Sequence, residues 1–124
     1  MPQEKKKILI IDDDGTLVHL LLLRLQHLGF LVDVALDGET GLKEALFFQP
    51  NIILLDIGMP KMGGWEICER LRSDPKTKNM PIIIITGLQP DDVKKRAQLL
   101  GIGHILCKPF QDEKLLGLLK SEMV

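Results

Sequence analysis

The sequence predicts an α/β fold: a doubly wound, five-stranded parallel sheet of strand order 2-1-3-4-5, with five helices. Three observations lead to this prediction. Short apolar runs alternate strictly with helical patterns along the chain, giving five successive β-then-α units. Several of the apolar runs are continuous, which is typical of parallel strands that helices cover on both faces. Right-handed crossovers leave few topologies for such a chain, and this order is the natural choice.

The first half of the chain contains two strands and two helices by this interpretation. The apolar run KILII predicts a strand at 7–11, and the alternation in FLVDVA predicts another at 30–35. The leucine-rich segment 16–29 predicts a helix that its final glycine ends. A second helix is expected over 37–48, where a nearby proline stops it.

The second half of the chain repeats the alternation three times. Apolar runs predict strands at 51–55, 82–86 and 104–107. The segments that follow them predict helices at 63–73, 90–101 and 111–122. The helix over 90–101 has a proline at its start and a glycine at its end, which is the usual asymmetry of helix termini.

Length and composition exclude several classes of protein. The 124 residues fit one domain, so we expect 1–124 to be a single domain with 1–6 as a lead-in. Sixteen basic and seventeen acidic residues leave no basic field for nucleic acid. With no signal peptide and no segment long enough to span a bilayer, we expect a cytoplasmic protein. Cys68 and Cys107 lie outside any CxxC motif and are expected to be free thiols, although a disulfide stays open.

Polar side chains end four of the five predicted strands, all at the same edge of the sheet. Asp12 and Asp13 follow the first strand and Asp56 follows the third, which is its neighbour in the predicted order. Carboxylates that converge repel one another, and a divalent cation relieves this repulsion. Oxygen ligands of this kind favour Mg²⁺. Thr86 and Lys108 end the fourth and fifth strands and would complete a pocket for a phosphoryl group bonded to a carboxylate.

Each of these residues alone has an ordinary explanation, as a helix cap, a β-former or a solvated charge. Together, in ILIIDDD, IILLDIGMPKMGGWE, IIIITG and CKPF, they resemble the receiver domain of two-component response regulators, over about residues 6–122. The resemblance implies a flavodoxin-like fold like that of chemotaxis regulators. The ligands to Mg²⁺ that it implies are Asp12, Asp13, Asp56 and the backbone carbonyl of Gly58.

The resemblance also implies a function. Asp56 would accept a phosphoryl group from a histidine kinase or a histidine phosphotransfer domain, while Thr86 and Lys108 contact the phosphoryl oxygens. A cis peptide bond between Lys108 and Pro109 would hold the lysine inward. The result would be a switch that changes a surface for a downstream protein, without direct contact to nucleic acid or membrane. Such a domain is a monomer or weak dimer, and is no enzyme beyond its own phosphotransfer and autodephosphorylation.

Two alternatives stay open at this point. The stretch IIDDDGTLV also resembles the opening motif of haloacid-dehalogenase-type phosphohydrolases, with Asp12 as nucleophile and Asp14 as general acid/base. Against this, the chain is short, no strand after Lys108 ends in an acidic pair, and LLDIGMPKMGG receives no role. The second alternative is a pseudo-receiver that binds partners without phosphorylation.

The sequence departs from the receiver pattern at three positions. Gly63 stands where Asp or Asn is usual, and Gly87 stands where Ala is usual. Ile105 replaces the aromatic residue or histidine that commonly precedes the lysine by three positions, and His104 points to the other face of the strand. Because isoleucine is stiff and apolar, we expect it to stay in a groove beside the fourth helix. Changes on phosphorylation should then centre on the loop 87–90 and that helix.

The leucine-rich first helix is a candidate docking surface for the phosphodonor. Helical spacing suggests a core face made of Leu17, Leu21, Leu25 and Leu28. An apolar stripe of Val18 and Leu22, beside Leu23, would then lie nearer the solvent. The alternative is that the helix buries a wide face and that its remaining leucines need no partner.

Overall fold

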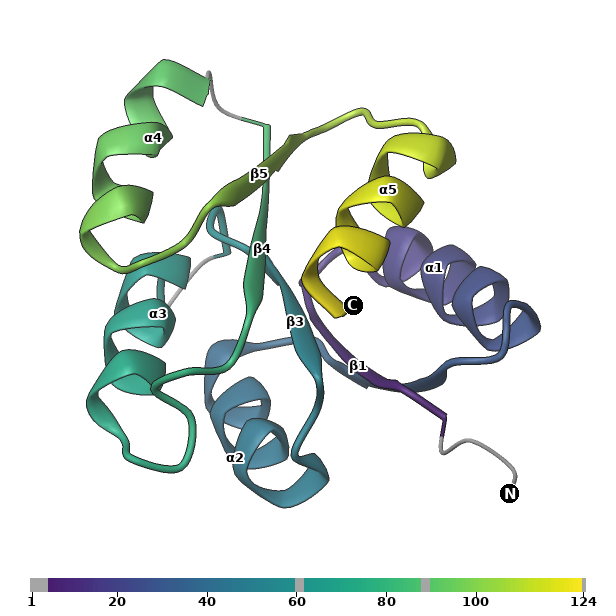
Figure 1. Cartoon of the computed structure of the whole chain (residues 1–124), viewed down its shortest axis with the longest axis horizontal. Helices are drawn as coiled ribbons and strands as arrows, with labels where there is room; N and C mark the ends of the chain where they lie inside the picture. Colours follow the sequence, from purple (N-terminus) through teal and green to yellow (C-terminus); the bar gives the residue numbers. More distant parts are fainter. Residues whose placement is uncertain (1–4, 60–61, 88–89, 124) are drawn as a thin grey trace.

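The computed structural model describes residues 5–59, 62–87 and 90–123. One parallel sheet has the strand order β2-β1-β3-β4-β5 (Figure 1). Its strands are β1 (Lys7–Ile11), β2 (Leu31–Ala35), β3 (Ile52–Asp56), β4 (Ile82–Thr86) and β5 (His104–Cys107). The helices are α1 (Gly15–His27), α2 (Gly38–Phe48), α3 (Gly64–Ser73), α4 (Pro90–Leu99) and α5 (Asp112–Met123). The predicted fold class and strand order are confirmed.

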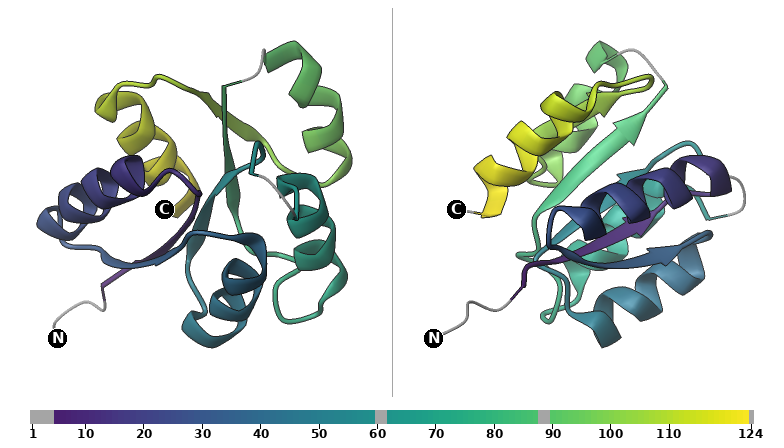
Figure 2. Two further views of the ribbon diagram at one scale, coloured as in Figure 1. Left: turned by 180° about the vertical axis from the view of Figure 1, so that it is seen from behind. Right: turned by 90° about the vertical axis from the view of Figure 1, so that its right-hand side faces the viewer.

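Helices cover both faces of the sheet, as Figure 2 shows from two sides. Helices α1 and α5 pack on one face, where their buried residues join Ile8 and Ile10 of β1. Helices α2, α3 and α4 pack on the other face, where Leu9 and Ile11 point. Strands β3 and β4 are buried along their whole length. This two-sided burial explains why the apolar runs are continuous instead of alternating.

The helix termini either match the predicted ones or differ from them by one or two residues, and glycines explain two of the differences. Helix α1 ends at His27, and Gly29 adopts a left-handed conformation with a φ of 97°. Helix α4 ends at Leu99, and Gly101 has a φ of 70°. In both cases the glycine lies beyond the helix, where only a residue without a side chain tolerates such a φ without cost.

The predicted orientation of α1 is partly wrong. Its buried residues are Val18, Leu21 and Leu25. Val18, expected near the solvent, is only 4% exposed, whereas Leu28, expected in the core, is 49% exposed. The helix is shorter than predicted, so Leu28 is its cap and not part of its core face. The leucines that α1 does expose most are Leu20 and Leu23.

Within the described residues neither Cys68 nor Cys107 takes part in a disulfide, as predicted. Cys68 is buried on α3, and burial raises the pKa of its thiol to about 12, which keeps it protonated and unreactive at neutral pH. Within 5–59, 62–87 and 90–123, the helices include none that is both long and apolar enough to cross a bilayer. Of the predicted lead-in, residues 1–4 lie outside the described residues, as do Pro60 and Lys61 of the motif around Asp56.

Candidate functional site

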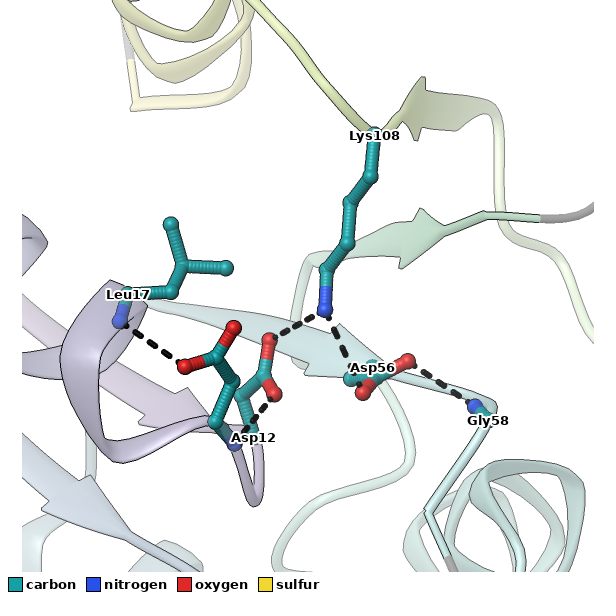
Figure 3. A network of polar contacts seen from close by, with 6 residues as sticks. Asp12, Leu17, Asp56, Gly58 and Lys108 are labelled. Atoms are coloured by element: carbon teal, nitrogen blue, oxygen red, sulfur yellow. Dashed lines mark hydrogen bonds and ion pairs between the residues drawn. The ribbon is translucent and has the colours of Figure 1, made fainter.

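The candidate site lies at the carboxyl edge of the sheet, where β1 and β3 run side by side. Asp12 directly follows β1, and Asp56 is the last residue of β3. Carboxylate oxygens of Asp12, Asp13 and Asp56 all lie within 4.8 Å of one another. Lys108 follows β5 and extends toward Asp12 and Asp56 (Figure 3). Thr86 ends β4, between the strands that carry Asp56 and Lys108, and is 1% exposed.

Asp12 is fully buried, and its two carboxylate oxygens differ in their partners. Oδ1 accepts a hydrogen bond from the backbone N–H of Asp14 at 2.9 Å. Oδ2 accepts no hydrogen bond within the described part of the chain, although Nζ of Lys108 lies 3.0 Å away as an ion pair. Burial raises the pKa of Asp12, and the charge of Asp56 adds to this effect, while the Asp14 amide and Lys108 oppose it. The charge of this carboxylate is therefore disfavoured mainly by burial, and Lys108 and the Asp14 amide offset this only in part.

Asp56 is held in a different way, and it keeps some contact with solvent. Its Oδ1 accepts a hydrogen bond from the backbone N–H of Gly58 at 2.9 Å, and its Oδ2 lies 3.4 Å from Nζ of Lys108 (Figure 3). The residue is 6% exposed. Gly58 is exposed and adds no side chain over the carboxylate. The carboxylate of Asp56 thus lies at the end of a buried strand with a small part of its surface open to solvent.

Lys108 connects the two carboxylates. Its backbone N–H donates to the carbonyl of Thr86 at 2.7 Å, and the Lys108–Pro109 peptide bond is cis, as the resemblance implies. Burial disfavours the ammonium, but Asp12 and Asp56 outweigh this effect and raise the pKa of Lys108. The side chain therefore stays charged at neutral pH. It is placed to meet an anion that binds between Asp56 and the end of β5.

Close packing fixes the backbone of Ile57, the residue that follows Asp56. A Cβ atom on Gly64, the first residue of α3, would lie only 2.2 Å from Cα of Ile57. The start of α3 therefore touches the backbone of the residue next to Asp56. A Cβ atom added to Gly63 would meet nothing within 4 Å. Gly63 is the N-cap of α3 and provides no side-chain hydrogen bond to the helix. The two adjacent glycines thus have different roles, which the sequence pattern alone did not separate.

The residues at this edge fit a bound divalent cation. The carboxylates of Asp12, Asp13 and Asp56 outnumber the ammonium of Lys108, and the buried Oδ2 of Asp12 lacks a hydrogen bond. A small hard cation with oxygen ligands would supply the missing positive charge. Mg²⁺ usually binds through one or two carboxylates and keeps several waters, which suits a site with an exposed member such as Asp13.

Asp14, the acid/base of the phosphohydrolase alternative, serves another purpose in the structure. Its Oδ1 accepts a hydrogen bond from the backbone N–H of Leu17 at 3.2 Å and thereby caps α1. The segment after Lys108 forms α5 from Asp112 to Met123, where that alternative needs a strand that ends in an acidic pair. Both observations weigh against the alternative.

Ile105 and His104 lie on opposite faces of β5, as their spacing predicts. Ile105 is partly buried on the face that α2, α3 and α4 cover, and it lines a groove with Lys94 and Gln98 of α4. Nε2 of His104 lies 3.0 Å from a carboxylate oxygen of Glu122 on α5. The expected response of residues 87–90 to phosphorylation stays a prediction, and Leu88 and Gln89 of that loop lie outside the described residues.

Neutralising Asp13 should stabilise the metal-free protein and weaken cation binding. We expect Asp13→Asn to raise the free energy of unfolding by about 1 kcal/mol in EDTA, because it removes one of three mutually repelling carboxylates. The same change should lower the affinity for Mg²⁺. Urea unfolding in EDTA and a Mg²⁺ titration measure the two effects. Clear destabilisation in EDTA, or an unchanged affinity, would contradict this account of the site.

Known proteins match nearly the whole length of this chain. A family model described as the response regulator receiver domain matches residues 8–120. The DNA-binding dual master transcriptional regulator RpaA of Synechocystis sp. is 36% identical over 115 residues, which are 93% of this chain and 48% of RpaA. The chain thus spans about half the length of this relative.

Solved structures resemble the chain over nearly its whole length. The chemotaxis protein CheY4 of Vibrio cholerae is 30% identical with a TM-score of 0.89, and the match covers 95% of this chain and 98% of that one. The receiver domain of the sensor histidine kinase PA1611 from Pseudomonas aeruginosa PAO1 has a TM-score of 0.86 at 22% identity, over 97% of this chain and 98% of that chain. The latter structure has a magnesium ion coordinated in its active site cleft.

Proposed function

The chain belongs to the response regulator receiver domain family, and on this premise we propose that Asp56 is the phosphoacceptor of a phosphorylation-controlled signalling switch. The observation that carries the proposal is the convergence of Asp12, Asp56 and Lys108 at one edge of the sheet, with Nζ of Lys108 within 3.4 Å of both carboxylates. Of the carboxylates there, Asp56 ends a fully buried strand and still reaches the solvent.

The residues of the site have different roles in the phosphotransfer. We assign Asp12, Asp13, Asp56 and the carbonyl of Gly58 to Mg²⁺, which would neutralise charge on the transferring phosphoryl group. The receiver domain of PA1611, which has this fold, holds magnesium at its active site, and this supports the assignment. With Oδ1 of Asp56 held by Gly58, Oδ2 forms the bond to phosphorus as the bond to the donor's histidine nitrogen breaks. Lys108 then pairs with a phosphoryl oxygen, and Thr86 donates its hydroxyl to another.

The partners follow from this role. A histidine kinase or a histidine phosphotransfer protein supplies the phosphoryl group in the cytoplasm, and a downstream protein surface reads the result. RpaA is named as a DNA-binding regulator, and this chain covers 48% of it. We therefore propose a DNA-binding segment or protein as the class of effector, with no direct contact between this domain and nucleic acid.

Intact mass spectrometry tests the proposal. After incubation with acetyl phosphate and Mg²⁺, the wild-type protein should gain the mass of one phosphoryl group. Asp56→Asn should gain none, because the amide is a poor nucleophile. EDTA should prevent the gain in the wild type. An unmodified wild type, or equal modification of Asp56→Asn, would overturn the assignment.

The exposed leucines of α1 lie where a phosphodonor would approach. A cavity of about 470 Å³ beside Lys108 is lined by Leu17 and Leu20 of α1 and by Phe110. A neighbouring groove continues from Leu20 to Leu23. This apolar surface starts at the phosphorylation site, which suits the docking role that the resemblance suggests for α1.

A charge on this surface should impair transfer from a protein donor selectively. Leu20→Glu should slow transfer from a histidine kinase about tenfold while leaving the reaction with acetyl phosphate unchanged, because Leu20 is 60% exposed and belongs to neither core cluster. Leu22, proposed from the sequence, is half-buried and would confuse docking with folding. Phe47→Glu is the control, since Phe47 is 88% exposed on α2, on the other face of the sheet. Equal loss with both donors would show that Leu20 only supports the fold.

A further inference from the structure

The run of three aspartates after β1 contains one residue, Asp14, to which the proposed function gives no role. Asp14 is the N-cap of α1, with an extended backbone at φ −80° and ψ 94°. Its side chain accepts from the N–H of Leu17 at 3.2 Å, and its carbonyl accepts from the N–H of Val18 at 2.9 Å. Two hydrogen bonds thus tie Asp14 to the first turn of α1.

The same residue also reaches back to the cation site through its backbone. The N–H of Asp14 donates to Oδ1 of Asp12 at 2.9 Å, and this is the hydrogen bond that orients the buried carboxylate. The other oxygen, Oδ2, accepts no hydrogen bond within the described part of the chain and faces Lys108. The direction of Oδ2 therefore depends on where the Asp14 amide is held.

Few other groups hold this amide in place. Gly15, the first residue of α1, has nothing within 4 Å of an added Cβ, so its backbone is restricted neither by a side chain nor by close packing. The first turn of α1 contains no acidic residue that could interact with the helix dipole. Besides the backbone hydrogen bond from the N–H of Val18, the start of the helix is thus restrained locally by the cap that the Asp14 side chain forms.

We propose that Asp14 is a positioning residue for the cation site: its side chain caps α1, and the backbone amide held in this way aims the Asp12 carboxylate. The inference rests on the proposed function, since it concerns the residues assigned to Mg²⁺. In the aspartate run, the first two residues then bind the cation, and the third fixes the geometry of Asp12. Asp14 itself is not a ligand, so its charge matters less than its ability to accept the hydrogen bond from Leu17.

Cap variants separate these two properties. Asp14→Ala removes both the cap and the charge, whereas Asp14→Asn removes the charge and keeps a good cap. Asp14→Ala should weaken Mg²⁺ binding about fivefold, as expected when a cap of ordinary strength is lost. Asp14→Asn should stay within about twofold of the wild type. Adding Gly15→Ala to Asp14→Ala should recover part of the affinity, because alanine fits there and stiffens the helix start.

The matched control is Asp37→Ala, which removes the corresponding cap of α2. The Asp37 side chain accepts from the N–H of Thr40 at 2.8 Å, so stability should fall to a similar extent while Mg²⁺ affinity stays within about twofold of the wild type. Mg²⁺ titrations followed by amide chemical shifts give the affinities. Amide exchange in EDTA gives a readout without metal: the N–H of residue 14 should exchange faster in Asp14→Ala, and at the wild-type rate in Asp14→Asn.

The outcomes are distinct. Wild-type affinity in Asp14→Ala would overturn the inference, as would an equal loss in Asp14→Asn, which would make the charge of Asp14 the decisive property. Unchanged exchange at residue 14 in Asp14→Ala would overturn it as well. A wild-type protein that binds no Mg²⁺ would instead refute the cation site of the proposed function, and the exchange experiment would still decide whether Asp14 holds the amide.

Discussion

Replacing Gly64 with alanine is expected to lower the free energy of unfolding by about 3 kcal/mol, at the upper end of the usual cost of overpacking. The added Cβ would lie 2.2 Å from Cα of Ile57 and 2.8 Å from its Cβ. Backbone atoms cannot move aside as a flexible side chain can, so either α3 shifts or the loop after Asp56 is displaced. Either response should also slow phosphorylation, because Ile57 adjoins Asp56, the proposed phosphoacceptor.

Gly63→Ala is the control for this prediction. It makes the same chemical change one residue earlier, where an added Cβ meets nothing within 4 Å. Its cost should stay below about 1 kcal/mol, since alanine is only a poorer N-cap than glycine. Urea unfolding of both variants measures the difference. Similar stabilities would mean that the start of α3 is not held against Ile57.

Replacing Lys108 with alanine should destabilise the metal-free protein by about 2 kcal/mol, because it leaves buried carboxylates without their cation. The value is below that for a fully buried pair, since the Lys108 side chain is 26% exposed. Phosphorylation of Asp56 by acetyl phosphate should still occur, but at least about tenfold more slowly. Lys114→Ala, at an exposed position of α5, should change neither property.

The stability that the protein loses in Lys108→Ala should depend on pH. Lys108 has a folded-state pKa above its ordinary value of 10.5, so its contribution to stability is complete below pH 10.5 and disappears at higher pH. Burial raises the pKa of Asp12 in the folded state above its ordinary value of 3.8. The contribution of Asp12 to the free energy of unfolding of the metal-free protein therefore falls as the pH rises from 3.8 through the folded-state pKa. Without Lys108 that pKa rises further. In EDTA, the difference in the free energy of unfolding between the wild type and Lys108→Ala should therefore become smaller as the pH is lowered. A difference that grows on acidification would contradict this explanation.

Much of the fold was predictable because the sequence pattern of each strand and helix is consistent with its place in the sheet. Continuous apolar runs identify buried parallel strands, and the strand order then brings Asp12 and Asp56 to neighbouring strand ends. The face of α1 was less predictable, because leucines surround the helix and the sequence does not show where the sheet lies. The actual core face, Val18, Leu21 and Leu25, joins one buried cluster with residues of β1, β3 and α5.

Other features depend on contacts that residue types alone do not reveal. The motif contains two adjacent glycines, but only the structure shows that Gly64 touches Ile57 and Gly63 touches nothing. The third aspartate of the run was assigned a chemical role in the competing interpretation. Its actual partners are the amide of Leu17 and, through its own N–H, the carboxylate of Asp12.

We propose that Asp56, and not Asp12, forms the acyl phosphate, and locating the modified residue distinguishes the two. The wild-type protein is phosphorylated with acetyl phosphate and Mg²⁺ and then treated with labelled borohydride, which reduces an acyl phosphate at the modified aspartate. Digestion and peptide mapping identify the labelled position. Label at Asp56, in the peptide that contains LLDIGMP, is the predicted result. Label at Asp12, in the peptide that contains IIDDDG, would contradict the account and favour a phosphohydrolase.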